Sequence, residues 1–202
     1  MERTASDPIK IAVFCSGISR GSNLEAMFRY FQQHNLPVRI ALAVFSRPDS
    51  PAYALAGKLG ICTTVVSTRN MERFESEALA VCQQNGIELI ALAGFMKQLS
   101  ERFIKAVQIP ILNIHPALLP KYGGKGMFGL AVHKAVFASK DKLSGASIHL
   151  VDPDYDHGRV LAQKSIDISD CTTCEEVAAK VLTCEHELYG QTIYDFLSGK
   201  IA

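Results

Sequence analysis

Two consecutive stretches, Ile9-Lys10-Ile11-Ala12-Val13-Phe14-Cys15 and Ser16-Gly17-Ile18-Ser19-Arg20-Gly21-Ser22-Asn23, indicate the fold class. The first is mostly apolar and β-branched, as is typical of a strand buried on both faces. The second contains two glycines and is followed by apolar residues at helical spacing, namely Leu24, Met27, Phe28 and Phe31. A strand, a glycine-containing loop and a helix in this order begin a β-α-β unit.

The same alternation continues along the chain. Further strands are predicted at 38–45, 61–66, 87–93 and 111–116, and further helices at 51–60, 71–85 and 100–107. This rhythm predicts an α/β fold with a Rossmann-like, doubly wound, mostly parallel sheet. Beyond it, strands at 144–152 and 159–168 and a helix at 175–197 predict a C-terminal strand pair and a long C-terminal helix. The core contacts expected on that helix are Val177, Val181, Leu188 and Ile193.

Composition limits the classes of function. The chain has 202 residues, of which 48% are hydrophobic and 20% charged, which fits one globular domain, predicted over residues 9–202. The 21 basic and 20 acidic residues nearly cancel, so bulk charge favours neither nucleic acid nor an anionic membrane as partner. No apolar run approaches the roughly 20 residues of a spanning helix. Residues 1–8 carry no apolar signal core and read as a frayed tail, so we expect a cytoplasmic protein.

The six cysteines do not predict a metal site or a disulfide framework. Most of them lie within apolar patterns, where reduced core thiols are the usual interpretation. Cys171 and Cys174 have the two-residue gap of zinc and redox pairs, but no second pair with matching spacing accompanies them. A turn at the start of the last helix is the favoured interpretation, and no metal is expected.

The end of the strand at 111–116 carries the first candidates for chemistry. Asn113 and His115 project from one face because side chains alternate along a strand, and Pro116 ends it. An amide donor beside a titratable ring suits a developing negative charge and a moving proton. The alternative is that both side chains only bond loop backbone. In open α/β sheets ligands bind beyond the carboxyl ends of the strands, where residues 17–23, 46–47 and 94–96 would also lie.

Three loops supply further candidates. Gly21, Ser22 and Asn23 stand at a helix start, where free amides and the helix dipole suit a phosphate, although a plain glycine turn with a polar cap fits as well. Asp154 and Asp156 lie between the last two strands, and either could reach His115, although such residues commonly bond turn backbone. Residues 123–129 contain four glycines and form either a lid or a flexible connector.

Four segments together resemble glycinamide ribonucleotide formyltransferase, the folate-dependent enzyme family of purine synthesis. They are residues 13–17 with 21–23, residues 92–96, residues 112–122, and Asp156 with Gly158. The resemblance covers nearly the entire chain and implies the formyltransferase fold. It also implies transfer of a formyl group from 10-formyltetrahydrofolate to the primary amine of glycinamide ribonucleotide, without a metal. These small molecules are then the expected partners of a monomer or homodimer.

The resemblance assigns roles residue by residue. It implies that Asn113, His115 and Asp156 are the catalytic trio, with Asp156 orienting His115 and helping to move a proton. Gly21, Ser22 and Asn23 would hold the substrate phosphate, and Glu185 would contact the same substrate. The residues implied in folate binding are Met96, Lys97, Gln98, Leu99 and Asn113, with Arg69 as a candidate only.

The sequence departs from the family pattern at three places. The loop 16–21 has two extra residues, Lys97-Gln98 stands where an Arg and an apolar residue are familiar, and His157 stands where a glycine is more usual. Three other functions stay open at this point: a 10-formyltetrahydrofolate hydrolase, a non-catalytic phosphosugar-binding module, and an NADP-dependent reductase using Arg47. The missing dinucleotide fingerprint disfavours the last.

Overall fold

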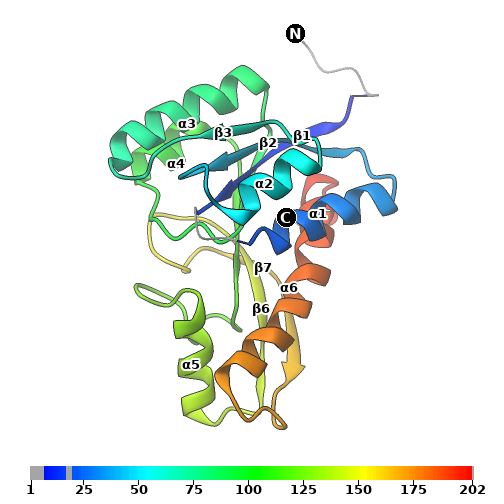
Figure 1. Ribbon diagram of the computed structural model, residues 1–202, viewed down its shortest axis with the longest axis vertical. Helices are drawn as coiled ribbons and strands as arrows, with labels where there is room; N and C mark the ends of the chain where they lie inside the picture. The colour runs from blue at the N-terminus through cyan, green and yellow to red at the C-terminus, as the bar shows by residue number, and fades with distance from the viewer. Residues whose placement is uncertain (1–6, 17–19, 202) are drawn as a thin grey trace. The chain divides into compact units, whose positions relative to one another are not determined.

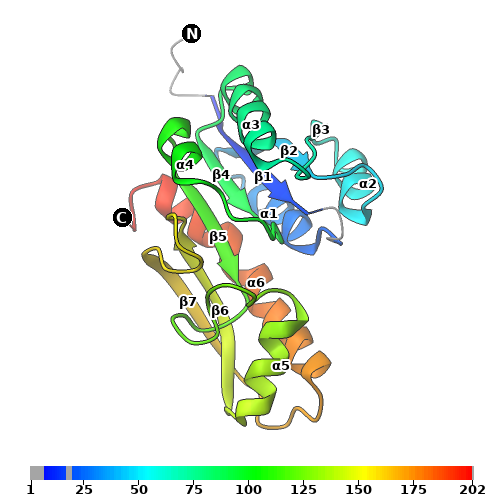
Figure 2. The same ribbon diagram turned by 90° about the vertical axis from the view of Figure 1, so that its left-hand side faces the viewer.

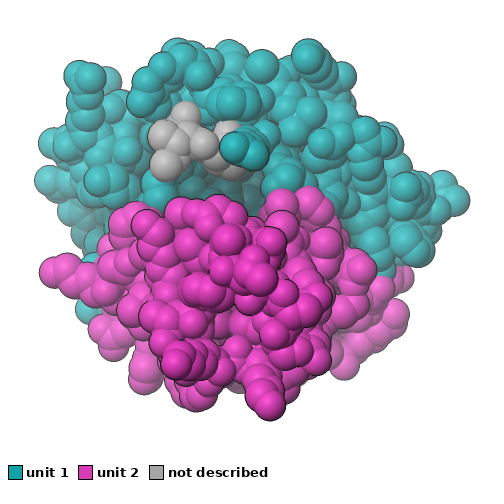
Figure 3. Space-filling view, turned by 60° about the horizontal axis from the view of Figure 1, so that its bottom comes forward, with its two compact units in different colours: residues 1–111 teal, residues 112–202 magenta. Residues whose placement is uncertain are grey.

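The computed structural model describes residues 7–16 and 20–201. The chain divides into two compact units, residues 1–111 and 112–202 (Figure 3). Of the predicted tail at 1–8, residues 1–6 lie outside the described residues, as do Gly17, Ile18 and Ser19 of the first loop. One domain over 9–202 stays a prediction.

Unit 1 alternates strands and helices, as the sequence predicts. Its elements are β1 (Ile9–Cys15), α1 (Ser22–Gln33), β2 (Val38–Phe45), α2 (Pro51–Lys58), β3 (Thr63–Val65), α3 (Met71–Asn85), β4 (Leu89–Leu92) and α4 (Glu101–Val107). β1 pairs in parallel with both β2 and β4, and β2 pairs in parallel with β3. Figures 1 and 2 show α1 and α2 on one face of these strands and α3 and α4 on the other.

Local sequence signals explain where the helices of unit 1 begin and end. Asn70 precedes α3 and its side-chain oxygen accepts from Arg73 N at 3.0 Å, while Gly86 ends the helix with a φ of 62°. Ser50 caps α2 in the same way, and Pro51 occupies the first turn. These caps satisfy backbone groups that have no partner within the helix. The predicted limits of α3 are therefore confirmed.

Unit 2 begins within β5 (Ile111–His115) and contains α5 (Leu130–Ser139), β6 (Leu143–Leu150), β7 (Val160–Asp167) and α6 (Cys174–Leu197). β5 pairs antiparallel with β6, and β6 pairs antiparallel with β7. The strand order of the seven-stranded sheet is β3-β2-β1-β4-β5-β6-β7. The mostly parallel sheet, the C-terminal strand pair and the long final helix are thus confirmed.

α5 and α6 build the apolar core of unit 2. Figure 1 shows the two helices beside β6. Buried residues of both helices form one cluster with Ala117, which follows β5, and Ile168, which follows β7: Ala117, Val132, Val136, Ile168, Val177 and Val181. α5 was not among the elements expected from the sequence. Gly129 precedes it with a φ of 55° and no side-chain cap, so the usual polar start signal is missing.

Some predicted details differ in the structure. β3 and β4 are shorter than the predicted ranges 61–66 and 87–93, since their flanking residues lie in loops. Val177, Val181 and Ile193 are buried on α6 as predicted, whereas Leu188 is only half-buried. No helix within the described part of the chain is long and apolar enough to cross a membrane.

The cysteines include buried core residues and two residues at the start of α6. All six cysteines are free thiols, and Cys15, Cys82 and Cys184 are buried. Thr173, between Cys171 and Cys174, caps α6 by accepting from Glu176 N at 3.2 Å. The turn at the helix start is therefore confirmed.

We expect Gly145→Ala to destabilise the protein, because a Cβ at this position of β6 would lie 2.0 Å from the carbonyl oxygen of Lys164 on β7. The paired strands would have to separate locally, at a cost of about 3 kcal/mol in the free energy of unfolding. Gly57→Ala in α2 is the control, since its Cβ meets nothing within 4 Å, and the gain in helix propensity should stabilise by about 0.5–1 kcal/mol. Urea unfolding measures the free energy of unfolding of both variants. Equal stability of the two would contradict the close approach of β6 and β7 at Gly145.

Candidate active site

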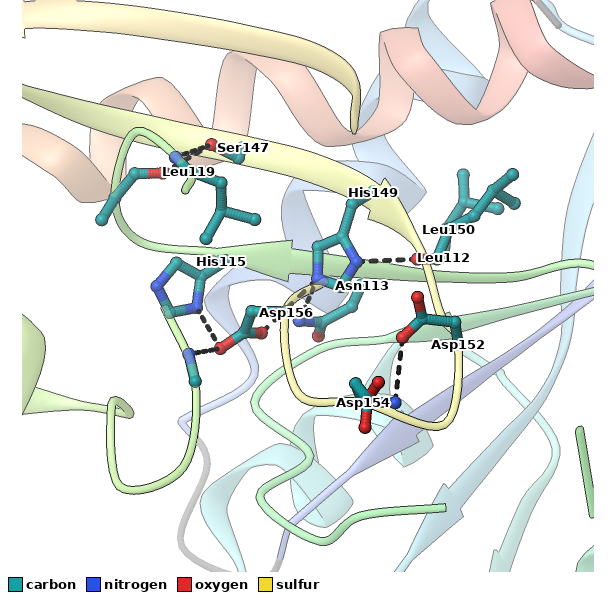
Figure 4. Close-up of polar contacts among 12 residues, drawn as sticks. Leu112, Asn113, His115, Leu119, Ser147, His149, Leu150, Asp152, Asp154 and Asp156 are labelled. Atoms are coloured by element: carbon teal, nitrogen blue, oxygen red, sulfur yellow. Dashed lines mark hydrogen bonds and ion pairs between the residues drawn. The ribbon is translucent and has the colours of Figure 1, made fainter. Parts of the chain in front are cut away.

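Four polar side chains of unit 2 meet at the end of β5: Asn113, His115, His149 and Asp156 (Figure 4). Asn113 and His115 share one face of β5, as predicted from strand alternation. The antiparallel register places His149 of β6 opposite Asn113. Asp156 comes from the turn between β6 and β7, so three separate segments build the cluster.

His115 is held at both ring nitrogens. Its Nδ1 lies 3.4 Å from Asp156 Oδ2, and its Nε2 lies 2.8 Å from the carbonyl oxygen of Tyr122. The side chain is 3% exposed, so water contributes little to its hydrogen bonding. Both neighbours are acceptors, and a neutral imidazole has only one N–H. The doubly protonated ring therefore satisfies both contacts at once, with Asp156 as its counter-charge.

Asp156 is the carboxylate that reaches the ring, and the alternative Asp154 does not. Asp154 is exposed, and its backbone N–H bonds Asp152 Oδ1 at 3.0 Å. Asp156 has a φ of 55°, a left-handed conformation that turns its side chain toward β5. Burial disfavours its charged form, but hydrogen bonds from His115, His149 and Gly124 outweigh that effect and hold the pKa of Asp156 well below its usual range. The site thus contains an ionised carboxylate.

His149 is a site residue that the sequence analysis missed. Its Nδ1 lies 2.8 Å from the Leu150 carbonyl oxygen and must carry a hydrogen. Its Nε2 lies 3.1 Å from Asn113 Nδ2 and 3.5 Å from Asp156 Oδ1. The neutral ring accepts from Asn113, and the protonated ring donates to Asp156. Strand alternation around Ser147 and His149 was the available signal, but only the register with β5 shows which residues His149 faces.

The glycine-rich segment 123–129 contacts the site through its backbone. Gly124 N donates to Asp156 Oδ2 at 2.9 Å. A Cβ on Gly123 would lie 2.6 Å from Leu119 Cδ2 and 3.2 Å from Asp156 Cβ, so a larger residue here would displace the end of the Leu119 side chain and crowd Asp156. This segment therefore helps to fix the carboxylate. Whether it acts as a lid stays a prediction.

His133 of α5 is buried, and burial, followed by the charge of His115, lowers its pKa to about 4. It is therefore neutral at pH 7 and adds no positive charge beside His115.

The predicted phosphate-binding residues of unit 1 lie at the start of α1. Gly21 is buried, has a φ of 86° and precedes the helix, and Ser22 and Asn23 are its first two residues. The first amides of a helix have no partner within it and favour an anion. The phosphate-binding role of these residues stays a prediction.

The predicted folate loop lies between β4 and α4. Met96 N donates to Ser16 Oγ at 3.0 Å, and Ser16 N donates to Gly94 O at 3.2 Å, so the ends of β1 and β4 are joined. Met96 is half-buried and Leu99 is buried. Lys97 and Gln98 are exposed.

The remaining candidates occupy separate positions. Arg69 is exposed in the connection before α3, and Glu185 is buried on α6. Arg47 forms an ion pair with Asp49 at the surface. Within the described residues, His, Cys, Asp and Glu side chains do not gather in groups of three that could hold a metal ion.

The cluster of unit 2 provides a paired carboxylate and imidazole beside a primary amide. Such an arrangement can stabilise an oxyanion and move a proton. Together with the α/β fold, this cluster favours an enzyme that acts through an anionic intermediate, as group-transfer enzymes do.

Comparison with known proteins is consistent with that class. Residues 9–193 match the family model described as formyl transferase, and the chain therefore belongs to the formyl transferase family. It is 37% identical over 188 residues to the chloroplastic phosphoribosylglycinamide formyltransferase of Arabidopsis thaliana, which covers 91% of this chain and 64% of the relative. It is 32% identical over 191 residues to the phosphoribosylglycinamide formyltransferase of Bacillus subtilis, covering 93% and 94%.

A solved structure gives the same result. The crystal structure of phosphoribosylglycinamide formyltransferase from Brucella melitensis superimposes with a TM-score of 0.84 at 35% identity, covering 94% of this chain and 96% of that one. The fold predicted from the resemblance is thus confirmed.

Proposed function

We propose that this protein transfers the formyl group of 10-formyltetrahydrofolate to the primary amine of glycinamide ribonucleotide. The observation that carries the proposal is the contact of His115 with both Asp156 and a backbone carbonyl, beside the amide of Asn113. The names of the Arabidopsis and Bacillus relatives support it. Because the chain spans only 64% of the Arabidopsis protein, activity and substrates are argued from the site as well.

The proposed reaction begins with attack of the amine nitrogen on the formyl carbon. This gives a tetrahedral oxyanion, which the amide N–H groups of Asn113 and the Nε2–H of His115 stabilise. In the free protein that N–H donates to the Tyr122 carbonyl, so the substrate oxygen takes its place. The bond from the formyl carbon to the folate nitrogen then breaks.

Asp156 completes the proton transfer. One proton leaves the attacking amine and one reaches the departing folate nitrogen, so charge balances. An ionised Asp156 stabilises the imidazolium of His115, and a water bonded to the carboxylate relays the proton. Its low pKa keeps it in the form that this role needs.

The substrates contact further residues in this proposal. The amides of Gly21, Ser22 and Asn23 bind the phosphate, and Glu185 contacts the same substrate. Met96, Lys97, Gln98 and Leu99 bind the folate, and Arg69 is a candidate for its carboxylates. The proposed site uses no metal.

A formyl-transfer assay tests this function. Purified protein receives 10-formyltetrahydrofolate with and without glycinamide ribonucleotide, and both formylated amine and free formate are measured. We expect amine-dependent product and little formate. Formate release without the amine would instead indicate a hydrolase, and binding of both ligands without turnover would indicate a binding module.

We expect Gly21→Ala to raise the KM for glycinamide ribonucleotide by about tenfold, while the KM for the folate changes less than about twofold. A Cβ at this position would lie 3.0 Å from Ala52 and Leu55 atoms and would displace the first amides of α1. Gly60→Ala is the control, since Gly60 also has a positive φ, 70°, but open space around it. Steady-state kinetics measures both variants. Equal KM values for the amine substrate in the two variants would remove the phosphate assignment.

A further inference from the structure

Tyr122 connects the catalytic cluster with a second group of polar side chains. Its carbonyl oxygen accepts from His115 Nε2 at 2.8 Å. Its phenol oxygen lies 2.7 Å from Asp141 Oδ2 and 2.6 Å from Ser139 Oγ. Since a carboxylate and a carbonyl can only accept, the phenol hydrogen points to Asp141, and the Ser139 hydroxyl donates to the carbonyl oxygen of Val136 at 2.7 Å. One residue is therefore bonded at its backbone to His115 and at its side chain to the segment between α5 and β6.

The backbone of Tyr122 is in an unfavourable conformation. Its φ is 58°, in the left-handed region that residues with a Cβ rarely adopt. Such a conformation persists only where the surrounding contacts require it. The direction of the Tyr122 carbonyl depends on this φ, so the contacts that hold the residue also direct its carbonyl at His115.

Packing alone does not fix the Tyr122 ring. One side of the residue packs against the apolar cluster of unit 2. It also lines a cavity of about 320 Å³, whose other walls include Leu118, Lys142 and Leu143. Apolar packing therefore surrounds Tyr122 on part of its surface only. The hydrogen bond from its hydroxyl to Asp141 adds a directional contact that apolar packing does not supply.

The ionised carboxylate of Asp141 accepts the hydrogen bond from the Tyr122 hydroxyl. The hydrogen bond from Tyr122, and then the contact with Lys121, lower the pKa of Asp141. Lys121 Nζ lies 3.2 Å from Asp141 Oδ2, the oxygen that also accepts from the phenol. An ionised, paired carboxylate accepts more strongly than a neutral group.

We propose that Tyr122 is a positioning residue: its hydroxyl, held by Asp141, directs its backbone carbonyl at His115 Nε2. A ring bonded at only one nitrogen can turn about its χ2 angle, whereas a ring bonded at both cannot. The carbonyl thus keeps Nε2–H where the substrate oxygen replaces it. This inference rests on the proposed function for what His115 does, but the contact itself can be tested separately.

The test compares Tyr122→Phe and Asp141→Ala with Tyr194→Phe, a control on α6 whose ring stands 4.9 Å from Lys200 Nζ. The first readout is the nitrogen NMR spectrum of histidine-labelled protein without substrates, with the His115 resonances assigned from His115→Ala. We expect the Nε2 resonance of His115 to move in both test variants and to stay in place in the control. Circular dichroism confirms that each variant is folded, and Asp141→Ala gives the answer if Tyr122→Phe does not fold.

The second readout is kinetic. We expect both test variants to lower kcat about tenfold, with KM for either substrate changing less than about twofold, because orientation rather than binding is lost. An unmoved His115 resonance, or an unchanged kcat, would overturn the inference. Failure of the wild-type protein to transfer formyl groups would refute the proposed function instead, and the NMR result would still decide whether Tyr122 positions His115.

Discussion

Asp156→Asn is expected to lower kcat for formyl transfer by about 100- to 1000-fold, with the fold intact. The amide has nearly the shape of the carboxylate but lacks its charge, so the imidazolium of His115 loses its partner at 3.4 Å. The asparagine side chain also places an NH2 group at one of the two oxygen positions, which are Oδ2 beside Gly124 N and His115 and Oδ1 beside His149. Steady-state kinetics at saturating concentrations of both substrates measures the effect.

Asp154→Asn is the matched control for this prediction. Asp154 lies in the same turn and carries the same charge, but it is exposed, and its backbone N–H donates to the Asp152 carboxylate. Its variant should keep kcat within about twofold of the wild-type value, since exposed charges contribute little. If both variants lose activity equally, the net charge of the turn matters, and the specific contact of Asp156 with His115 does not.

His115→Ala should reduce kcat by at least about a hundredfold, because it removes an oxyanion donor and the group that carries the proton. The KM values should change less, since the ring acts mainly in the transition state. If one site performs both reactions, the rate of formyl transfer and the rate of formate release should fall by the same factor in His115→Ala relative to the wild-type protein.

His157→Ala serves as the control for His115→Ala. The His157 side chain is 78% exposed and pairs with Asp152, away from the cluster. We expect wild-type kinetics from it. Near-wild-type turnover of His115→Ala would reject the mechanism and would favour a binding module, in which substitution of His115 changes little.

Much of the fold was predictable because its signals are local. The limits of β1, β2 and α3 follow from apolar runs, a capping asparagine and a terminal glycine, each of which acts within a few residues of its own position. α5 lacked such a signal, because Gly129 starts it without a side-chain cap. Its helical state depends on packing against α6 in the core of unit 2.

The candidate site was predictable only in part, for the same reason. The alternation of β5 places Asn113 and His115 on one face without further information. Which aspartate reaches His115 could not be read from the turn, since Asp154 and Asp156 have the same chemistry. The choice depends on the left-handed backbone of Asp156 and on the amide of Gly124, which is 32 residues away.

The sequence by itself determined the α/β class, the order of the elements and the resemblance to the formyltransferases, because periodicity, caps and motifs are encoded in neighbouring residues. Only the tertiary structure decided that His149, 36 residues from Asn113, joins the cluster and that the Tyr122 carbonyl holds His115. Strand register and backbone direction set these contacts. Both arise when the strands pair and the core packs.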